Sequence, residues 1–158
     1  MTDLNDNTET SHAYLERIFE RRASQASKAL SLFRRRNPSD ALPHNDLDLG
    51  DMDMHGINLA CLDLRGAYLR GANLRRTDLE GADLREADLE GGKLDNAILL
   101  ETDFSEADLR YASFKGADLR RADFSGANLT GANFEGALLA GADFEGANLQ
   151  DVKGFPAK

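Results

Sequence analysis

The sequence predicts an all-β solenoid, a chain wound into stacked coils whose sides are each five residues long. Large apolar residues occur at every fifth position through 21 units without an insertion or deletion. Two residues after these central residues, 11 of the 21 positions hold Gly. Neither an α-helix nor a β-strand has a period of five. The central residues are Leu49, Met54, Leu59, Leu64, Leu69, Leu74, Leu79, Leu84, Leu89, Leu94, Leu99, Phe104, Leu109, Phe114, Leu119, Phe124, Leu129, Phe134, Leu139, Phe144 and Leu149.

Each unit has the alternation of a short strand. The central residue and the residue two before it share one parity and point inward, whereas the residues on either side of the centre point outward. From Ala67 onward the inner position before the centre holds 14 Ala, two Thr and one Gly, so the walls can approach closely. Gly after the centre permits a turn with positive φ at each corner. Successive coils are expected to pair through their backbones about 4.8 Å apart.

Several units carry a recognisable signature: GADLR at 81–85, EADLE at 86–90, GADLR at 116–120 and GANLT at 126–130. This pattern resembles the pentapeptide repeat family. The resemblance implies a right-handed quadrilateral parallel β-helix with four pentapeptides per coil. Residues 47–151 would then form about five coils with a rise of roughly 24 Å. The order of the aromatic centres supports four sides, because Phe replaces Leu only in two of the four columns that a 20-residue coil creates.

Both ends of such a solenoid need cover, because the core and the unpaired backbone edges are exposed there. We expect a disordered tail at 1–10, an amphipathic capping α-helix at 11–36, a linker at 37–46 and a short C-terminal cap or tail at 152–158. Ser11 is a suitable N-cap, and Asn37-Pro38 ends the helix. The expected cap contacts join Leu15, Ile18, Phe19, Leu30 and Phe33 of the helix to Leu47, Met52, Ile57 and Leu62 of the first coil.

The N-terminal helix has an alternative interpretation, since it is rich in Arg and Lys. A basic amphipathic helix can also lie on an anionic membrane or bind a partner. We favour the cap because the first coil carries large residues at the inner positions that hold Ala later in the chain. At the C-terminus, Phe155 either forms a minimal lid or leaves this end to pair with another molecule.

Composition narrows the classes of function. The chain has 158 residues, a net charge of -9, and one cysteine, Cys61, which excludes an internal disulfide. No segment approaches the roughly 18 apolar residues of a membrane span, and the first residues are polar and acidic, so we expect a cytoplasmic protein. The acidity belongs to the repeat and argues against direct nucleic-acid binding.

Catalysis finds no support in the residue pattern. His12, His44 and His55 are scattered, and none has a cysteine or a second histidine at ligand spacing. No nucleophile lies beside a base in a recognisable arrangement, and the filled interior leaves no evident cleft. The sequence therefore predicts a non-enzyme with no cofactor and no metal.

An acidic ladder is predicted on one side of the coil: Asp63, Asp83, Asp103, Asp123 and Asp143. Asp and Asn at this position can bond to nearby turn backbone, which is the favoured explanation because the preference occurs on every side. The alternative is mimicry of a row of phosphates. The resemblance includes fluoroquinolone-resistance proteins that imitate duplex DNA and bind bacterial DNA gyrase, and relatives that protect hosts making gyrase-targeting toxins.

The chain departs from that branch in several ways. It is shorter, it lacks the loops that interrupt the repeat in several members, and it has no extended C-terminal dimerisation segment. It also carries two basic bands, which a duplex mimic should not have. The bands are Arg65, Arg70, Arg75, Arg76 and Arg85, then Arg110, Lys115, Arg120 and Arg121.

A second surface departs from the repeat's chemistry. Ile98 and Leu100 flank Leu99 where other units have Asp or Asn and polar residues, and Leu138 and Ala140 occupy the equivalent positions two coils later. Apolar side chains that share one outward face indicate a protein interface, although single surface hydrophobes are common. Tyr68 and Tyr111 are weaker candidates for such a role.

The sequence thus predicts a small cytoplasmic β-solenoid that serves as a non-catalytic protein-interaction module or scaffold with an unidentified partner. A homodimer through the C-terminal end or the Ile98 face is another form of the same hypothesis. The alternative function is a bacterial-type, DNA-mimicking inhibitor or protector of DNA gyrase. Cys61 is interpreted as an incidental surface thiol, because no basic neighbour is evident to lower its pKa.

Overall fold

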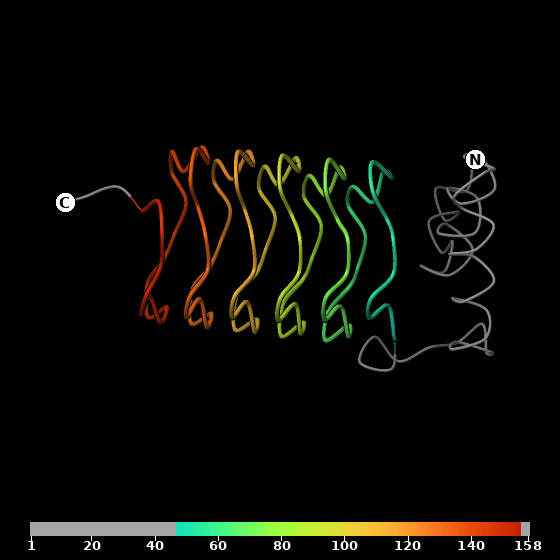
Figure 1. Cartoon of the computed structure of the whole chain (residues 1–158), viewed down its shortest axis with the longest axis horizontal. Helices are drawn as coiled ribbons and strands as arrows, with labels where there is room; N and C mark the ends of the chain where they lie inside the picture. Colours follow the sequence, from blue (N-terminus) through green and yellow to red (C-terminus); the bar gives the residue numbers. More distant parts are fainter. Residues whose placement is uncertain (1–46, 156–158) are drawn as a thin grey trace, which may run out of the picture.

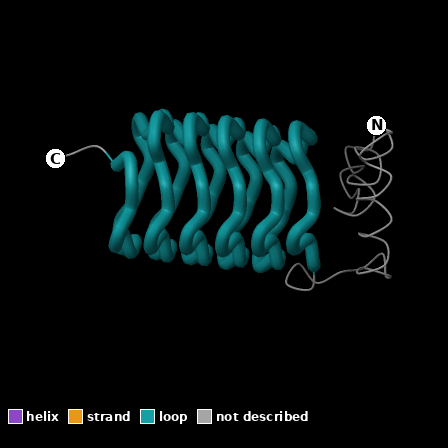
Figure 2. The backbone as a smooth tube through the Cα atoms, viewed as in Figure 1, coloured by secondary structure: helices purple, strands orange, loops and turns teal. Residues whose placement is uncertain are grey.

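The computed structural model describes residues 47–155, which wind into coils stacked along one axis (Figure 1). The chain alternates between tight turns and short extended segments along this whole stretch (Figure 2). Within it the structure has no helix, hence none that could span a membrane, and no strand longer than a single bridged residue. The predicted tail at 1–10, capping helix at 11–36 and linker at 37–46 lie outside the described residues, as do residues 156–158.

The coils are held together by parallel bridges between residues 20 apart. They run in unbroken series from Asp48↔Tyr68 to Asn133↔Lys153. The pairing is regular: the Leu49 N–H donates to the Tyr68 carbonyl at 2.8 Å, and the Tyr68 N–H donates to the Leu47 carbonyl at 2.9 Å. Twenty residues are four pentapeptides, so each coil has four sides, as predicted. Each side bridges through one residue only, because the corner turn follows immediately.

Every corner is a turn whose tightest residue lies two positions after the centre. Throughout residues 47–155 that residue has φ between +55° and +76°, whether or not it is glycine. The turn closes with a bond from the next N–H back to the central carbonyl, as from Ala67 to Leu64 at 3.1 Å. An L-residue in this left-handed region costs roughly 1–2 kcal/mol. One complete coil, with corners at Asn96, Glu101, Glu106 and Tyr111, carries no corner glycine.

Two glycine corners allow a matched test of this strain. A Cβ at Gly131 would lie 2.7 Å from Cδ1 of Tyr111, whereas at Gly136 the nearest atoms are 3.9 Å away, and φ is +70° and +71° respectively. We expect Gly131→Ala and Gly136→Ala each to lower the free energy of unfolding by roughly 1–2 kcal/mol through φ. Gly131→Ala should cost more, because the Tyr111 ring must also move. Urea denaturation measures both, and equal losses would contradict the ring contact.

The core is a narrow column filled by the two inward residues of each side. The ring of Phe124 stacks between those of Phe104 and Phe144, with centroids 5.1 and 5.0 Å apart and planes within 6° of parallel. It meets Phe114 and Phe134 edge to face at 5.8 Å. These rings form the two Phe columns expected from a 20-residue coil. Thr102, at a position usually held by Ala, is buried and donates to the Leu79 carbonyl at 2.8 Å.

The two ends differ in what the structure shows. Leu47, Met52, Ile57 and Leu62 of the first coil are buried. Their predicted partners in the cap, Leu15, Ile18, Phe19, Leu30 and Phe33, lie outside the described residues, so these contacts stay a prediction. At the other end Phe155 packs edge to face on Phe144, with centroids 5.0 Å apart. The central Leu149 nevertheless remains 36% exposed.

Candidate functional site

The solenoid presents four flat faces, each made of the residues directly before and after one column of centres. We name them by residues that they display. The Ile98 face flanks Leu59, Leu79, Leu99, Leu119 and Leu139. The aspartate face flanks Leu64, Leu84, Phe104, Phe124 and Phe144. The Tyr68 face flanks Leu49, Leu69, Leu89, Leu109, Leu129 and Leu149, and the lysine face flanks Met54, Leu74, Leu94, Phe114 and Phe134.

On all four faces, the Asp or Asn before the centre forms a hydrogen bond with nearby backbone. The side-chain oxygen accepts a hydrogen bond from the backbone N–H two residues later. Examples, one from each face, are Gly50 to Asp48 at 3.1 Å, His55 to Asp53 at 3.2 Å, Ala60 to Asn58 at 3.0 Å and Ser105 to Asp103 at 2.9 Å. This is an Asx-turn, which orders the residue that enters the corner. Turn chemistry therefore accounts for the Asp and Asn preference without a ligand.

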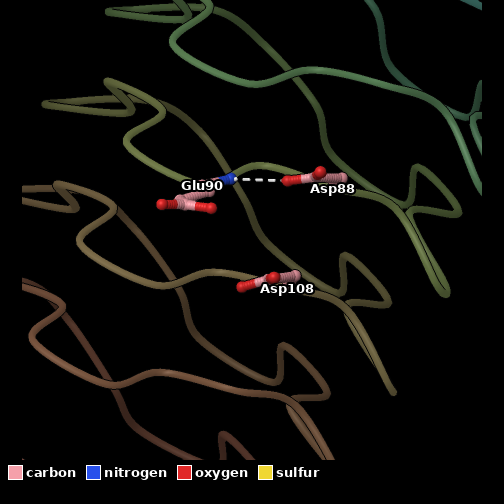
Figure 3. A group of neighbouring side chains, drawn as sticks. All are labelled: Asp88, Glu90 and Asp108. Atoms are coloured by element: carbon pink, nitrogen blue, oxygen red, sulfur yellow. Dashed lines mark hydrogen bonds between the residues drawn. The ribbon is translucent and has the colours of Figure 1, made fainter.

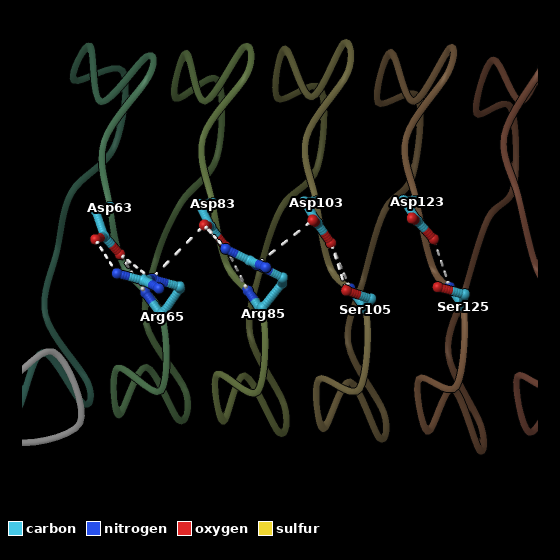
Figure 4. A network of polar contacts seen from close by, with 8 residues as sticks. All are labelled: Asp63, Arg65, Asp83, Arg85, Asp103, Ser105, Asp123 and Ser125. Carbon is cyan, nitrogen blue, oxygen red and sulfur yellow. Dashed lines mark hydrogen bonds and ion pairs between the residues drawn. The ribbon is translucent and has the colours of Figure 1, made fainter.

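The aspartate face carries all five residues of the predicted ladder. Figure 4 shows Asp63, Asp83, Asp103 and Asp123, with the guanidinium groups of Arg65 and Arg85 between the first of them. Arg65 binds Asp63 with two bonds of 2.9 and 2.8 Å and lies 3.7 Å from Asp83. Arg85 likewise binds Asp83 at 2.9 and 2.6 Å and lies 3.6 Å from Asp103. This hydrogen bond lowers the pKa of Asp83. The N-terminal half of the ladder is therefore neutralised.

The C-terminal half of the same face differs. Ser105 and Ser125 replace Arg, and Ser105 Oγ donates to Asp103 at 2.6 Å. Among residues 47–155, Asp123 and Asp143 have no ion pair, and Glu145 adds a further carboxylate. On the aspartate face, unpaired negative charge before the centre is thus limited to the last coils, about half of the predicted ladder.

The Tyr68 face holds three carboxylates that approach one another, from Asp88, Glu90 and Asp108 (Figure 3). Their oxygens lie within 4.8 Å, a grouping that could hold a cation. Two guanidinium groups already supply the positive charge: Arg110 lies 2.8 Å from Glu90 and 2.6 Å from Asp108, and Arg70 lies 2.7 Å from Glu90. The cluster is therefore an ion-pair network between coils.

The basic bands seen in the sequence are mostly parts of such pairs. Arg65, Arg85, Arg110 and Arg120 each bind the Asp two residues earlier. On the lysine face Arg75 binds Asp95 at 2.8 Å, and Lys115 binds Glu135 at 2.9 Å. The sequence signal for the first group is the tripeptide Asp-Leu-Arg, since residues i and i+2 of a strand lie on one side. A count of charges along the sequence does not reveal this pairing.

These pairs give the fold a predictable acid sensitivity. Hydrogen bonds from Arg85 and Arg110 hold the pKa of Asp83 and Asp108 below the ordinary value of 3.8. A lowered folded-state pKa adds stability that is present above pH 3.8 and is lost as the pH falls through the folded-state value. We expect Arg85→Gln/Arg110→Gln to lose less unfolding free energy than the parent between pH 7 and pH 3 in urea titrations. Equal losses would show that other carboxylates govern acid unfolding.

The Ile98 face places the predicted interface residues outward and on one side. Ile98 is 44% exposed and Leu138 54% exposed, Ala140 is exposed and Leu100 half-buried. Ile98 bridges Asp78 below and Asp118 above, so one charged coil separates it from Leu138. Tyr68 is equally exposed but lies on another face, and the Tyr111 ring leans on Gly131 of the next coil.

Comparisons with known proteins agree with this architecture. A family model described as pentapeptide repeats matches in eight copies over residues 63–99, 93–126 and 117–153. The pentapeptide repeat protein Rfr23 from the cyanobacterium Cyanothece 51142 is 27% identical, with a TM-score of 0.70 over 79% of this chain and 95% of that one. Pentapeptide repeat proteins form right-handed quadrilateral β-helices, in keeping with the four-sided coil.

Two further solved structures match this chain. A pentapeptide repeat protein from the Arabidopsis thaliana thylakoid lumen is 33% identical, with a TM-score of 0.37 over 66% of this chain and 63% of that one. QnrB1, a plasmid-mediated fluoroquinolone resistance protein, is 17% identical, with a TM-score of 0.37 over 66% of this chain and 78% of that one. No curated protein matched.

Proposed function

The chain belongs to the pentapeptide repeat family, and we propose that it is a cytoplasmic, non-catalytic interaction module that binds a protein partner through the Ile98 face. The family is generally an interaction fold without enzymatic activity. Its filled core offers rigid flat faces, which suit the binding of a protein surface. Binding through the C-terminal end, as a homodimer, is a second form of this proposal.

The observation that carries the proposal is the exposure of Ile98 and Leu138 at positions where the fold favours Asp or Asn. At those positions an Asp or Asn side chain would accept the N–H two residues later, as Asp118 does from Arg120 at 3.3 Å. Ile and Leu cannot make this bond, and they leave apolar area in water. Apolar residues that forgo a local hydrogen bond and share one face indicate a contact surface.

A matched pair of variants tests the proposal. Ile98→Asn/Leu138→Asn restores the common residue at two positions of the Ile98 face. Tyr68→Asn makes the same kind of change at the same place in the repeat on a different face, with equal initial exposure. We expect the double variant to lose the partner captured from a lysate of the source organism, with its melting temperature kept, and Tyr68→Asn to retain it. Retention by both variants would remove the Ile98 face from consideration.

The second candidate function is inhibition or protection of DNA gyrase. It is supported by the anionic half of the aspartate face, where Asp123, Asp143 and Glu145 lie beyond the last guanidinium. It is weakened by Arg65 and Arg85, which neutralise the other half. Gyrase supercoiling should be assayed across a titration of the protein with and without a fluoroquinolone. Inhibition or drug protection that Asp123→Lys/Asp143→Lys abolishes would favour this candidate, and no effect at high concentration would exclude it.

A further inference from the structure

On the Ile98 face, charged coils lie at equal distances on both sides of the apolar middle coil. There Ile98 and Leu100 project side by side from the same pentapeptide. One coil away, the outward residues are charged in both directions. Two coils away the residue after the centre is a small apolar one on both sides, Ala60 toward the N-terminus and Ala140 toward the C-terminus, whereas the residue before it is Asn58 on one side and Leu138 on the other. A surface whose charged coils lie at equal distances from an apolar centre suits an isologous contact, in which the same patch serves both copies.

The arginine of the Ile98 face pairs with fewer carboxylates than the arginines of the aspartate and Tyr68 faces do. Arg65 and Arg85 each reach a second carboxylate on the next coil, and Arg110 reaches Glu90. Arg120 binds Asp118 at 2.6 Å, and between residues 47 and 155 it has no second acidic partner, because the neighbouring coils present apolar side chains. Its side chain stays 51% exposed.

An acidic residue that lacks a basic partner among residues 47–155 lies at the equivalent position in the coil on the other side of Ile98. Glu80 is exposed, and within the described part of the chain it makes no ion pair. Glu80 and Arg120 both directly follow a central residue, so they lie along one line parallel to the solenoid axis, one coil below and one coil above Leu100.

We propose that the Ile98 face binds a second copy of this chain in antiparallel orientation. The two-fold axis lies in the interface, perpendicular to the solenoid axis, and runs over Ile98 and Leu100. The inference rests on the proposed function and assigns its partner. The axis brings Ile98 and Leu100 against their own copies at the centre. It brings Glu80 of each copy opposite Arg120 of the other, and Ala60 opposite Ala140.

The pairing of Glu80 favours the antiparallel arrangement over the parallel one. A two-fold axis along the solenoid would instead place each residue before a centre against the partner's residue after the same centre. Asp78 would then face Glu80 twice, which leaves Glu80 without a cation, and Arg120 would face Asp118, the residue that it already binds within its own chain. In the antiparallel arrangement Asp78 meets Asp118, whose charge is already neutralised by Arg120 and whose pKa that hydrogen bond lowers.

The contact area sets the expected strength. Five coils give a face roughly 24 Å long, and a side of about three extended residues is roughly 10 Å wide, so the buried area lies below the roughly 1,200 Å² of a stable complex. We therefore expect a reversible dimer that forms at micromolar concentration. Sedimentation velocity between about 5 and 500 µM covers this range. A chain that remains monomeric throughout would overturn the inference.

Charge reversal tests the register. Glu80→Arg and Arg120→Glu should each weaken the dimer about tenfold or more, because each creates two repulsive pairs per dimer. Glu80→Arg/Arg120→Glu should restore the parent dissociation constant, since the pairs reform with exchanged signs. Glu145→Arg, at the same place in the repeat on the aspartate face, is the matched control and should change nothing. Strengthening by Glu80→Arg alone would indicate the parallel arrangement and overturn the proposal.

Crosslinking provides a test that does not depend on charge. In a Cys61→Ser background, a chain with Ala60→Cys is mixed with a tagged chain with Ala140→Cys. A bismaleimide that spans about 10 Å, the spacing of packed sheets, is then added. The mixture should give the mixed dimer, and each chain alone should give far less. Equal yields from each chain alone would contradict the antiparallel register.

The outcomes separate this inference from the proposed function. A monomeric chain whose captured partner is lost in Ile98→Asn/Leu138→Asn would overturn the second copy as occupant and leave the face as an interface. A dimer that the same variant leaves intact would overturn the inference, since the copies must then meet elsewhere. A dimer lost in that variant and kept in Tyr68→Asn is the result that we expect.

Discussion

Phe124→Ala is expected to lower the free energy of unfolding by about 3–5 kcal/mol, the range for an aromatic residue removed from a packed core. Phe124 is fully buried and contacts four other rings, two stacked and two edge to face. Its neighbours belong to a continuous solenoid wall and cannot collapse into the cavity. Urea denaturation followed by circular dichroism measures the loss.

Phe144→Ala is the control for this prediction. Phe144 belongs to the same column, but it is half-buried and stacks on one side only, against Phe124. Its removal should cost clearly less. If the two variants lost the same stability, the stacked column would not be the source of the effect.

Ala107→Asp is expected to prevent folding or to lower the unfolding free energy by at least about 4 kcal/mol. Ala107 points into the core two residues before Leu109 and is fully buried. A carboxylate there would lose its hydration without gaining a cation, a cost of several kcal/mol per buried ion. Thermal denaturation and yield of soluble protein report the outcome.

Ala140→Asp makes the same chemical change on an outward position. Ala140 is exposed, so the new carboxylate keeps its water and should change stability by less than about 0.5 kcal/mol. A large loss from Ala140→Asp, or a small one from Ala107→Asp, would contradict the inward and outward assignment of the repeat.

The fold could be predicted from the sequence because two local signals agree at every unit. The apolar centre fixes which side chains point inward, and the frequent corner glycine marks a turn with positive φ. The 20-residue register was also predictable, since the Phe centres fall into two of four columns. The structure confirms this register from Asp48↔Tyr68 onward. The cap is different, because residues 11–36 lie outside the described part of the chain.

The surface was less predictable because it depends on contacts between coils. Alternation within each unit, together with the 20-residue coil, predicted that Ile98 and Leu138 point outward on one face. The charge balance along the five ladder residues depends on such contacts, since Arg85 reaches Asp103 only after the coil has closed. Corner strain at residues such as Tyr111 could not be foreseen either. The sequence indicated positive φ only at the corners that hold glycine. In the structure every corner has positive φ, because the stacked coils impose it on any residue at that position.

Photo-crosslinking tests the central claim, binding through the Ile98 face, most directly. A photo-reactive amino acid replaces Ala140 in cells of the source organism, and another chain carries it at Glu145, the same place in the repeat on the adjacent face. We predict one crosslinked product from position 140 and little from position 145. Mass spectrometry would identify it as a second copy or another protein. Equal products from both positions, or none from position 140, would contradict the account.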